Sequence, residues 1–164
     1  MEEQDKIYRD TQKILNKLIS EEIIAGDFYN GCVASVNPMQ RRVIEEKFSE
    51  IARDELEDHA RVLTKFAIEN GFEVPFKYKD IERHSSKKMV AKFNTLKRGE
   101  DAPYYIERAI ESEVEAIKSY EECMAGGYLF DLQPVMLKCY YEEMKHLEDL
   151  QLLLTCANIG VDLK

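Results

Sequence analysis

The sequence predicts an all-α protein: an antiparallel four-helix bundle made of two helical hairpins joined by a long crossover with a short helix. Three observations lead to this prediction. Apolar residues recur at three- and four-residue spacing along most of the 164 residues, the chain contains only 7 glycines and 4 prolines, and few segments alternate like strands. We therefore expect long amphipathic helices and no sheet.

No linker rich in Gly, Pro or Ser divides the chain, so we expect a single domain over residues 1–164. A chain of this size buries roughly 70% of its unfolded surface, which is enough for one core. The first hairpin is expected at about 5–70, the crossover at 71–101 and the second hairpin at about 102–158.

The first helix is expected from about Asp5 or Thr11 to Val36. Its inward residues follow a spacing of 3-4-3-4-3 and are Leu15, Leu18, Glu22, Ala25, Tyr29 and Cys32. Glu22 thus lies in the middle of an apolar stripe, where a carboxylate needs a partner.

A second helix is expected from Pro38, after Asn37 as its N-cap, to about Asn70, where Gly71 ends it. Its inward stripe consists of Phe48, Ala52, Glu55, His59, Val62 and Phe66. A carboxylate and a histidine again interrupt the apolar pattern.

The crossover contains Pro75 and many polar residues. One short amphipathic helix after Ser85-Ser86 is indicated by Met89, Val90, Phe93 and Leu96. The crossover also carries a basic run, which we interpret as a solvated helix face: Arg83, Lys87, Lys88, Lys92, Lys97 and Arg98. Because the net charge of the chain is -9, we expect no nucleic acid partner.

The third helix opens near Asp101-Ala102-Pro103 and should run to Met124, before Gly126-Gly127. Its inward residues are Ile106, Ile110, Glu113, Ala116, Tyr120 and Cys123.

The fourth helix is expected from about Pro134 to Ala157. It places Glu143 and His146 three residues apart, so both point toward the apolar side formed by Met136, Cys139, Leu147, Leu150 and Leu154. Burying this pair without a partner would cost several kcal/mol, on the order of an unpaired buried charge, so a bound metal is the leading candidate.

An internal repeat links the two hairpins. Glu22, Ala25, Tyr29 and Cys32 recur at a constant offset as Glu113, Ala116, Tyr120 and Cys123. Within each hairpin the acidic residues are equidistant from the turn, so the pairs Glu22 with Glu55 and Glu113 with Glu143 lie at the same level. If the halves pack with pseudo-twofold symmetry, four carboxylates and two imidazoles meet at the centre of the bundle.

Four glutamates balance the charge of two divalent ions, and each histidine can complete one of them. Oxygen ligands with imidazole suit iron or manganese, and this arrangement on four helices is that of di-iron carboxylate proteins. We therefore expect two iron ions, or manganese in their place, bound by Glu22, Glu55, His59, Glu113, Glu143 and His146.

The runs at residues 48–59 and 106–120 resemble the rubrerythrin-like branch of the ferritin-like superfamily. The resemblance covers the four helices. It implies a di-iron centre that reacts with oxygen or hydrogen peroxide, as a ferroxidase or peroxidase in iron or oxidative-stress handling, with an unknown electron donor. Carried over by position, the four inward glutamates are the carboxylate ligands and the two inward histidines the nitrogen ligands. Tyr29 and Tyr120 are expected to be core aromatics whose hydroxyls bond a ligand carboxylate.

The chain departs from this family in two ways. Glu55 and His59 are four residues apart, where the family has three. Either a one-residue π-bulge absorbs the difference, or Asp58 takes the usual position and His59 drops out of the site. In addition, Ile110 stands where rubrerythrins have a further inward glutamate, and the sequence has no Cys-x-x-Cys of the rubredoxin type.

Three alternatives stay open at this level: iron storage in an oligomeric shell, a di-iron hydroxylase of an organic substrate, and a metal-free interaction module. We expect a homo-oligomer, a dimer or larger.

Cys32 and Cys123 are expected to be inert core thiols, although Cys123 and Cys139 flank one turn and could pair. With no signal peptide pattern and no apolar run of membrane length, we expect a cytoplasmic protein without membrane contact.

Overall fold

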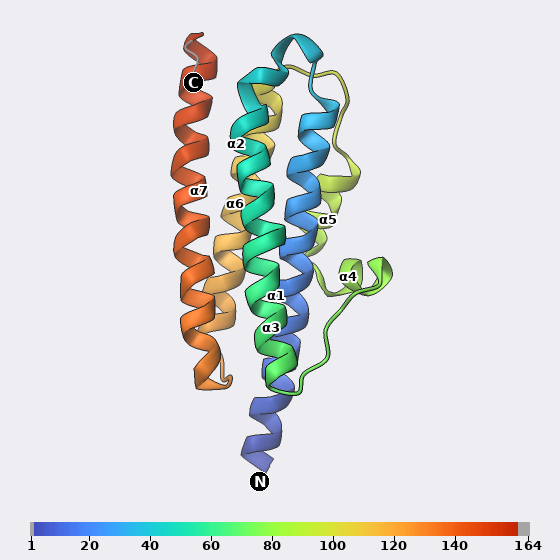
Figure 1. Ribbon diagram of the computed structural model, residues 1–164, viewed down its shortest axis with the longest axis vertical. Coiled ribbons are helices and arrows are strands. Elements are labelled where there is room, and N and C mark those ends of the chain that lie inside the picture. Colours follow the sequence, from blue (N-terminus) through green and yellow to red (C-terminus); the bar gives the residue numbers. More distant parts are fainter. Residues whose placement is uncertain (1, 161–164) are drawn as a thin grey trace.

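A computed structural model describes residues 2–160 and shows long antiparallel helices packed side by side (Figure 1). The elements are α1 (Glu2–Ser35), a 3-10 turn η1 (Pro38–Gln40), α2 (Arg41–Arg53), a π-helix η2 (Asp54–His59), α3 (Ala60–Glu69), α4 (Tyr78–His84), α5 (Lys87–Asn94), α6 (Ala102–Met124), a 3-10 turn η3 (Phe130–Leu132) and α7 (Gln133–Ile159). Elements α2, η2 and α3 follow one another without a break and form the second long rod. The predicted all-α bundle of two hairpins is confirmed.

The turn of the first hairpin forms as its residues predict. The Asn37 side chain accepts a hydrogen bond from the backbone N–H of Met39 at 3.1 Å, and Pro38 begins η1. The α-helical geometry itself starts only at Arg41, after the 3-10 turn. Just after the C-terminal end of α3, Gly71 adopts a φ of 77°, a left-handed conformation that glycine adopts readily.

The crossover differs from the prediction, because it contains two short helices, α4 and α5, instead of one. The unpredicted helix α4 buries only Ile81, so its seven residues show no apolar periodicity. Ile81 and Met89 pack against Ile24 and Ala25, and this contact lays the crossover along α1 (Figure 1).

Two apolar clusters fill the bundle, one toward each end. One contains Phe28 and Phe48 together with residues of α6 and the end of α7, and the other contains Leu15 and Leu63 together with residues around the second turn. Glu22 and the other inward acidic residues lie between these two clusters along the bundle axis. The polar centre is therefore sealed by apolar side chains on both sides.

The inward stripe of α1 is buried as predicted, whereas in the other three long helical segments some buried positions differ from the predicted ones. After the π-helix, Leu63 is buried in place of Val62, because the extra residue rotates the helix on its C-terminal side. In α7 the stripe continues through Leu153 instead of Leu154, and Ile110 in α6 is only partly buried. Within residues 2–160, no helix has both the length and the apolar composition that a membrane span requires.

Candidate metal centre

The six residues proposed from the sequence as ligands come together in the middle of the bundle, and each is at most 4% exposed. They form two overlapping groups: Glu22, Glu55, His59 and Glu143, and Glu55, Glu113, Glu143 and His146. Within each group the candidate ligand atoms lie within 4.8 Å of one another. Since Glu55 and Glu143 belong to both groups, the cluster suits two cations that share two carboxylates.

The π-helix η2 brings His59 into this cluster. Both Glu55 and His59 are buried, and His59 Nδ1 lies 3.2 Å from Glu22 Oε2 and 3.0 Å from Glu143 Oε1. Of the two alternatives, the structure contains the π-helix and places His59 beside the glutamates. Asp58 lies outside their cluster, since its side chain is 38% exposed and accepts a hydrogen bond from Lys138 Nζ at 2.7 Å.

Close packing against α1 accompanies the π-helix. Leu56 of η2 lies directly over Gly26 of α1, and a Cβ at Gly26 would collide with the Leu56 side chain. The glycine thus permits an approach between α1 and η2 that a Cβ would disturb, because the Leu56 side chain or one of the two helices would have to shift.

Each imidazole is held from outside by a carboxylate of the opposite hairpin. Asp54 Oδ2 lies 2.9 Å from His146 Nε2, and Glu142 Oε1 lies 3.0 Å from His59 Nε2. When Nε2 carries the proton and donates a hydrogen bond to the carboxylate, the lone pair of Nδ1 faces the centre of the cluster. The sequence analysis missed both acids; the signal was their position, since each directly precedes a shared glutamate, Glu55 or Glu143.

The two tyrosines connect the halves of the repeat. Tyr29 Oη donates a hydrogen bond of 2.7 Å to Glu113, and Tyr120 Oη donates one of 2.7 Å to Glu22. Burial, together with the neighbouring carboxylates, raises the pKa of both phenols, so they remain protonated donors. These are the hydroxyl–carboxylate contacts that the sequence predicts.

Several buried polar atoms of the cluster make no hydrogen bond: both carboxylate oxygens of Glu55, both of Glu143, Oε2 of Glu113 and Nδ1 of His146. Some of them lie at ion-pair distance from one another, since Glu143 Oε1 is 3.0 Å from His59 Nδ1 and Glu55 Oε1 is 3.1 Å from His146 Nδ1. Burial and the surrounding negative charge raise the pKa of Glu55 and Glu143. Burial alone would lower the pKa of His146, but the adjacent Glu113 and Glu143 raise it to about 9. Oxygen and nitrogen donors that face one another in this way fit divalent cations, which would satisfy them all.

This electrostatic arrangement predicts how the metal-free protein responds to pH. The folded-state pKa of His146, about 9, lies above the ordinary value of 6.5, so its stabilising proton is fully bound below 6.5 and lost as the pH rises through 9. The raised pKa values of Glu55 and Glu143 act in the same direction. For His146 alone the loss is about 3 kcal/mol, or roughly 6 to 12 °C in Tm. Thermal melts of chelator-treated protein between pH 6 and 9.5 measure it, and a Tm that stays level or rises would contradict it.

The cysteines lie outside this chemistry. All four are free and buried, so the pairing of Cys123 with Cys139 considered from the sequence is not present. Burial raises the pKa of Cys123 to about 11 and that of Cys139 to about 12, which keeps both as unreactive thiols.

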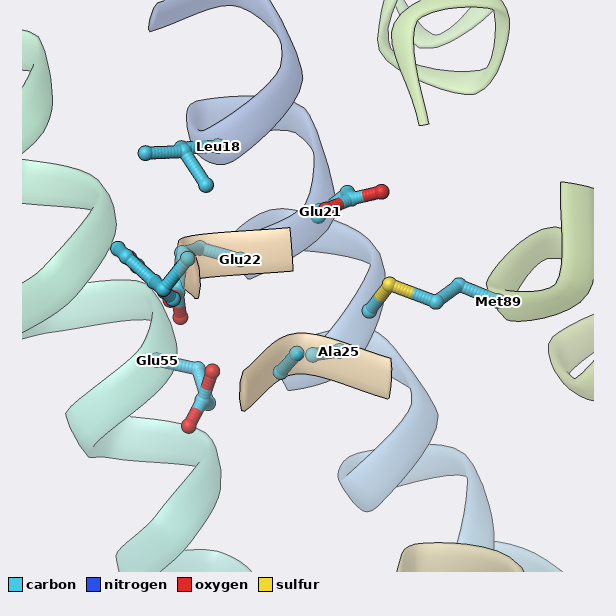
Figure 2. Close-up of a pocket in the computed structure, with 8 residues that line it drawn as sticks. Leu18, Glu21, Glu22, Ala25, Glu55 and Met89 are labelled. Carbon is cyan, nitrogen blue, oxygen red and sulfur yellow. The ribbon is translucent and has the colours of Figure 1, made fainter. Parts of the chain in front are cut away.

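A small cavity touches the cluster. Its volume is about 10 Å³, and it is lined by Leu18, Glu21, Glu22, Ala25, Glu55, Met89, Ala116 and Tyr120 (Figure 2). A space of this size holds about one water-sized molecule. The candidate metal centre therefore has room beside Glu22 and Glu55 for a very small reactant.

Fold and site together define a helical-bundle protein with a buried cluster of glutamates and histidines suited to two metal ions. The family model of Rubrerythrin matches residues 13–154, and the chain belongs to this family. No curated protein sequence matches it. Among solved structures, the fold is similar to that of a dodecameric thioferritin, the bacterioferritin-related protein from Bacteroides fragilis, with a TM-score of 0.74 and 22% identity over 98% of this chain and 96% of that chain. The ferritin-like fold predicted from the sequence is thereby confirmed.

Proposed function

We propose that this protein is a di-iron oxidoreductase that reacts with oxygen or hydrogen peroxide, as a ferroxidase or peroxidase. The observation that supports this proposal is the set of buried carboxylate and imidazole atoms that face one another without hydrogen-bond partners. In this assignment Glu22 and His59 hold one ion, Glu113 and His146 hold the other, and the remaining two glutamates of the cluster are shared. Ferrous iron held by these side chains would supply the electrons that reduce the oxidant.

The residues around the ligands favour this use. Asp54 and Glu142 fix the orientation of the two imidazoles. The hydroxyls of Tyr29 and Tyr120 donate hydrogen bonds to the carboxylates of Glu113 and Glu22. The two apolar clusters exclude bulk water from both ends of the centre. The cavity of about 10 Å³ holds about one water-sized molecule, which is far too small for the organic substrate of a hydroxylase.

Stopped-flow mixing of the ferrous-loaded protein with oxygen, and separately with hydrogen peroxide, tests the proposal. Iron oxidation by at least one oxidant should be about 100-fold faster in the wild type than in Glu113→Ala. Glu111→Ala, which removes an exposed glutamate from the same helix, is the matched control and should behave as the wild type. Equal rates in the wild type and Glu113→Ala would reject the oxidoreductase.

Iron storage in an oligomeric shell is the second candidate. It is favoured by the likeness in fold to a protein described as a dodecameric thioferritin. In this case, the same centre would feed iron into the cavity of a homo-oligomer. Light scattering tests this second candidate, because a monomer or dimer in solution excludes a closed shell.

A further inference from the structure

We propose that Met89 of the crossover is a plug that closes a gap in the bundle wall between α1 and α6, and that it controls how fast small molecules reach the metal centre. This inference rests on the proposed function. It assigns a role to the crossover, which belongs to neither hairpin and carries none of the ligands.

The gap arises from two small residues at equivalent positions of the internal repeat. Ala25 follows Glu22 by three residues in α1, and Ala116 follows Glu113 by three residues in α6. Both alanines are buried, and both line the cavity that reaches Glu22 and Glu55. With only a methyl group from each helix at this level, the wall between α1 and α6 is thin beside the metal centre.

Met89 covers this gap from outside. In Figure 2 the Met89 side chain reaches from the right toward Ala25, while Glu22 and Glu55 lie to the left of Ala25. Met89 is 3% exposed, and it is the residue through which the crossover lines the cavity, whose other walls come from α1, η2 and α6. A methionine is unbranched and flexible, so it can fill an irregular gap and still move aside.

A polar contact holds the start of α5 in place. Glu21 Oε2 accepts a hydrogen bond of 2.8 Å from the backbone N–H of Ser86, the residue before α5, and one of 3.1 Å from Lys17 Nζ. Glu21 is 4% exposed and also lines the cavity, and its Oε1 has no hydrogen-bond partner. Because Ser86 lies three residues before Met89, this contact fixes the position of the plug.

An open depression of the surface lies beside this contact. A surface depression of about 240 Å³ is lined by Lys17, Ser86, Lys87, Lys88, Glu115, Lys118, Ser119 and Glu122. Lys17 and Ser86 thus line the depression and also bind Glu21, which lines the inner cavity. The Glu21 contact therefore lies between the inner cavity, which Met89 also lines, and the open depression.

The test measures the association of azide, a small anion, with the cobalt-loaded protein by visible absorption. The cobalt content is determined first. Met89→Ala should increase the azide association rate about 10-fold or more, because it removes the plug, whereas Met89→Leu should restore a rate near that of the wild type. Met144→Ala, which alters an exposed methionine on α7, is the matched control and should leave the rate unchanged.

A second variant tests the polar contact without opening a hole in the core. Ser86→Pro removes the N–H that Glu21 accepts from, and the backbone of Ser86, with φ -54° and ψ 135°, already suits proline. It should accelerate azide binding about threefold. The role of Met89 as a plug would be overturned if azide associated with Met89→Ala and Ser86→Pro at the wild-type rate. It would also be overturned if azide changed the visible absorption of none of the cobalt-loaded variants. Absence of bound cobalt would instead reject the proposed function.

Discussion

Replacement of Glu143 by glutamine should abolish tight binding of both metal ions and should stabilise the metal-free protein above neutral pH. Glu143 is fully buried and belongs to both candidate ligand groups, so a neutral amide in its place removes a shared carboxylate from each. In the metal-free state, burial and the neighbouring carboxylates raise the pKa of this group, and its closest ion-pair partner is His59 Nδ1, 3.0 Å from Oε1. Its loss should therefore contribute about 1–3 kcal/mol to folding.

Titration of the chelator-treated protein with manganese, followed calorimetrically, measures this effect. Glu143→Gln should weaken both binding steps about 100-fold, whereas Glu113→Gln should weaken one step and leave the other. Glu148→Gln, at an exposed position of the same helix, is the matched control. If Glu143→Gln kept one ion at wild-type affinity, the shared-carboxylate arrangement would be wrong.

Replacement of Gly26 by alanine should destabilise the protein, although alanine normally favours a helix by about 1 kcal/mol over glycine. A Cβ at this position would collide with Leu56, so α1 and the π-helix would have to separate or Leu56 would have to leave its place. Forcing extra volume into a packed contact costs about 1–3 kcal/mol. Because η2 also carries His59, we expect metal binding on the His59 side to weaken as well.

Gly31→Ala is the matched control for this substitution. Gly31 lies in the same helix, and a Cβ there would be 3.8 Å from Leu96, an ordinary van der Waals distance. It should stabilise the protein by about 0.5–1 kcal/mol. Urea unfolding of the two variants gives the comparison; a Gly26→Ala protein as stable as Gly31→Ala would show that α1 and η2 do not need their close approach.

The sequence allowed the bundle and the meeting of the six side chains to be predicted. The acidic residues interrupt long apolar stripes, and their distances from the turns place Glu22 opposite Glu55 and Glu113 opposite Glu143. Even the π-helix had a local signal, since Glu55 and His59 are four residues apart on one inward face.

Other parts of the site had a weaker signal or none. Asp54 and Glu142 directly precede Glu55 and Glu143, but they are partly exposed and resemble solvated acids until tertiary packing brings each to a histidine of the other hairpin. Helix α4 buries a single residue, Ile81, which gives no periodicity to detect. The contact of Met89 with the cavity depends on how the crossover lies against α1, and this is a property of packing and not of local sequence.

Anomalous X-ray diffraction from crystals of the iron-loaded protein, together with metal analysis of the same sample, tests the central claim most directly. We predict two iron ions per chain, one beside His59 and one beside His146, with Glu55 and Glu143 between them. An iron-loaded sample with no metal at this cluster, or with a single ion that leaves one histidine without a metal, would contradict the assignment.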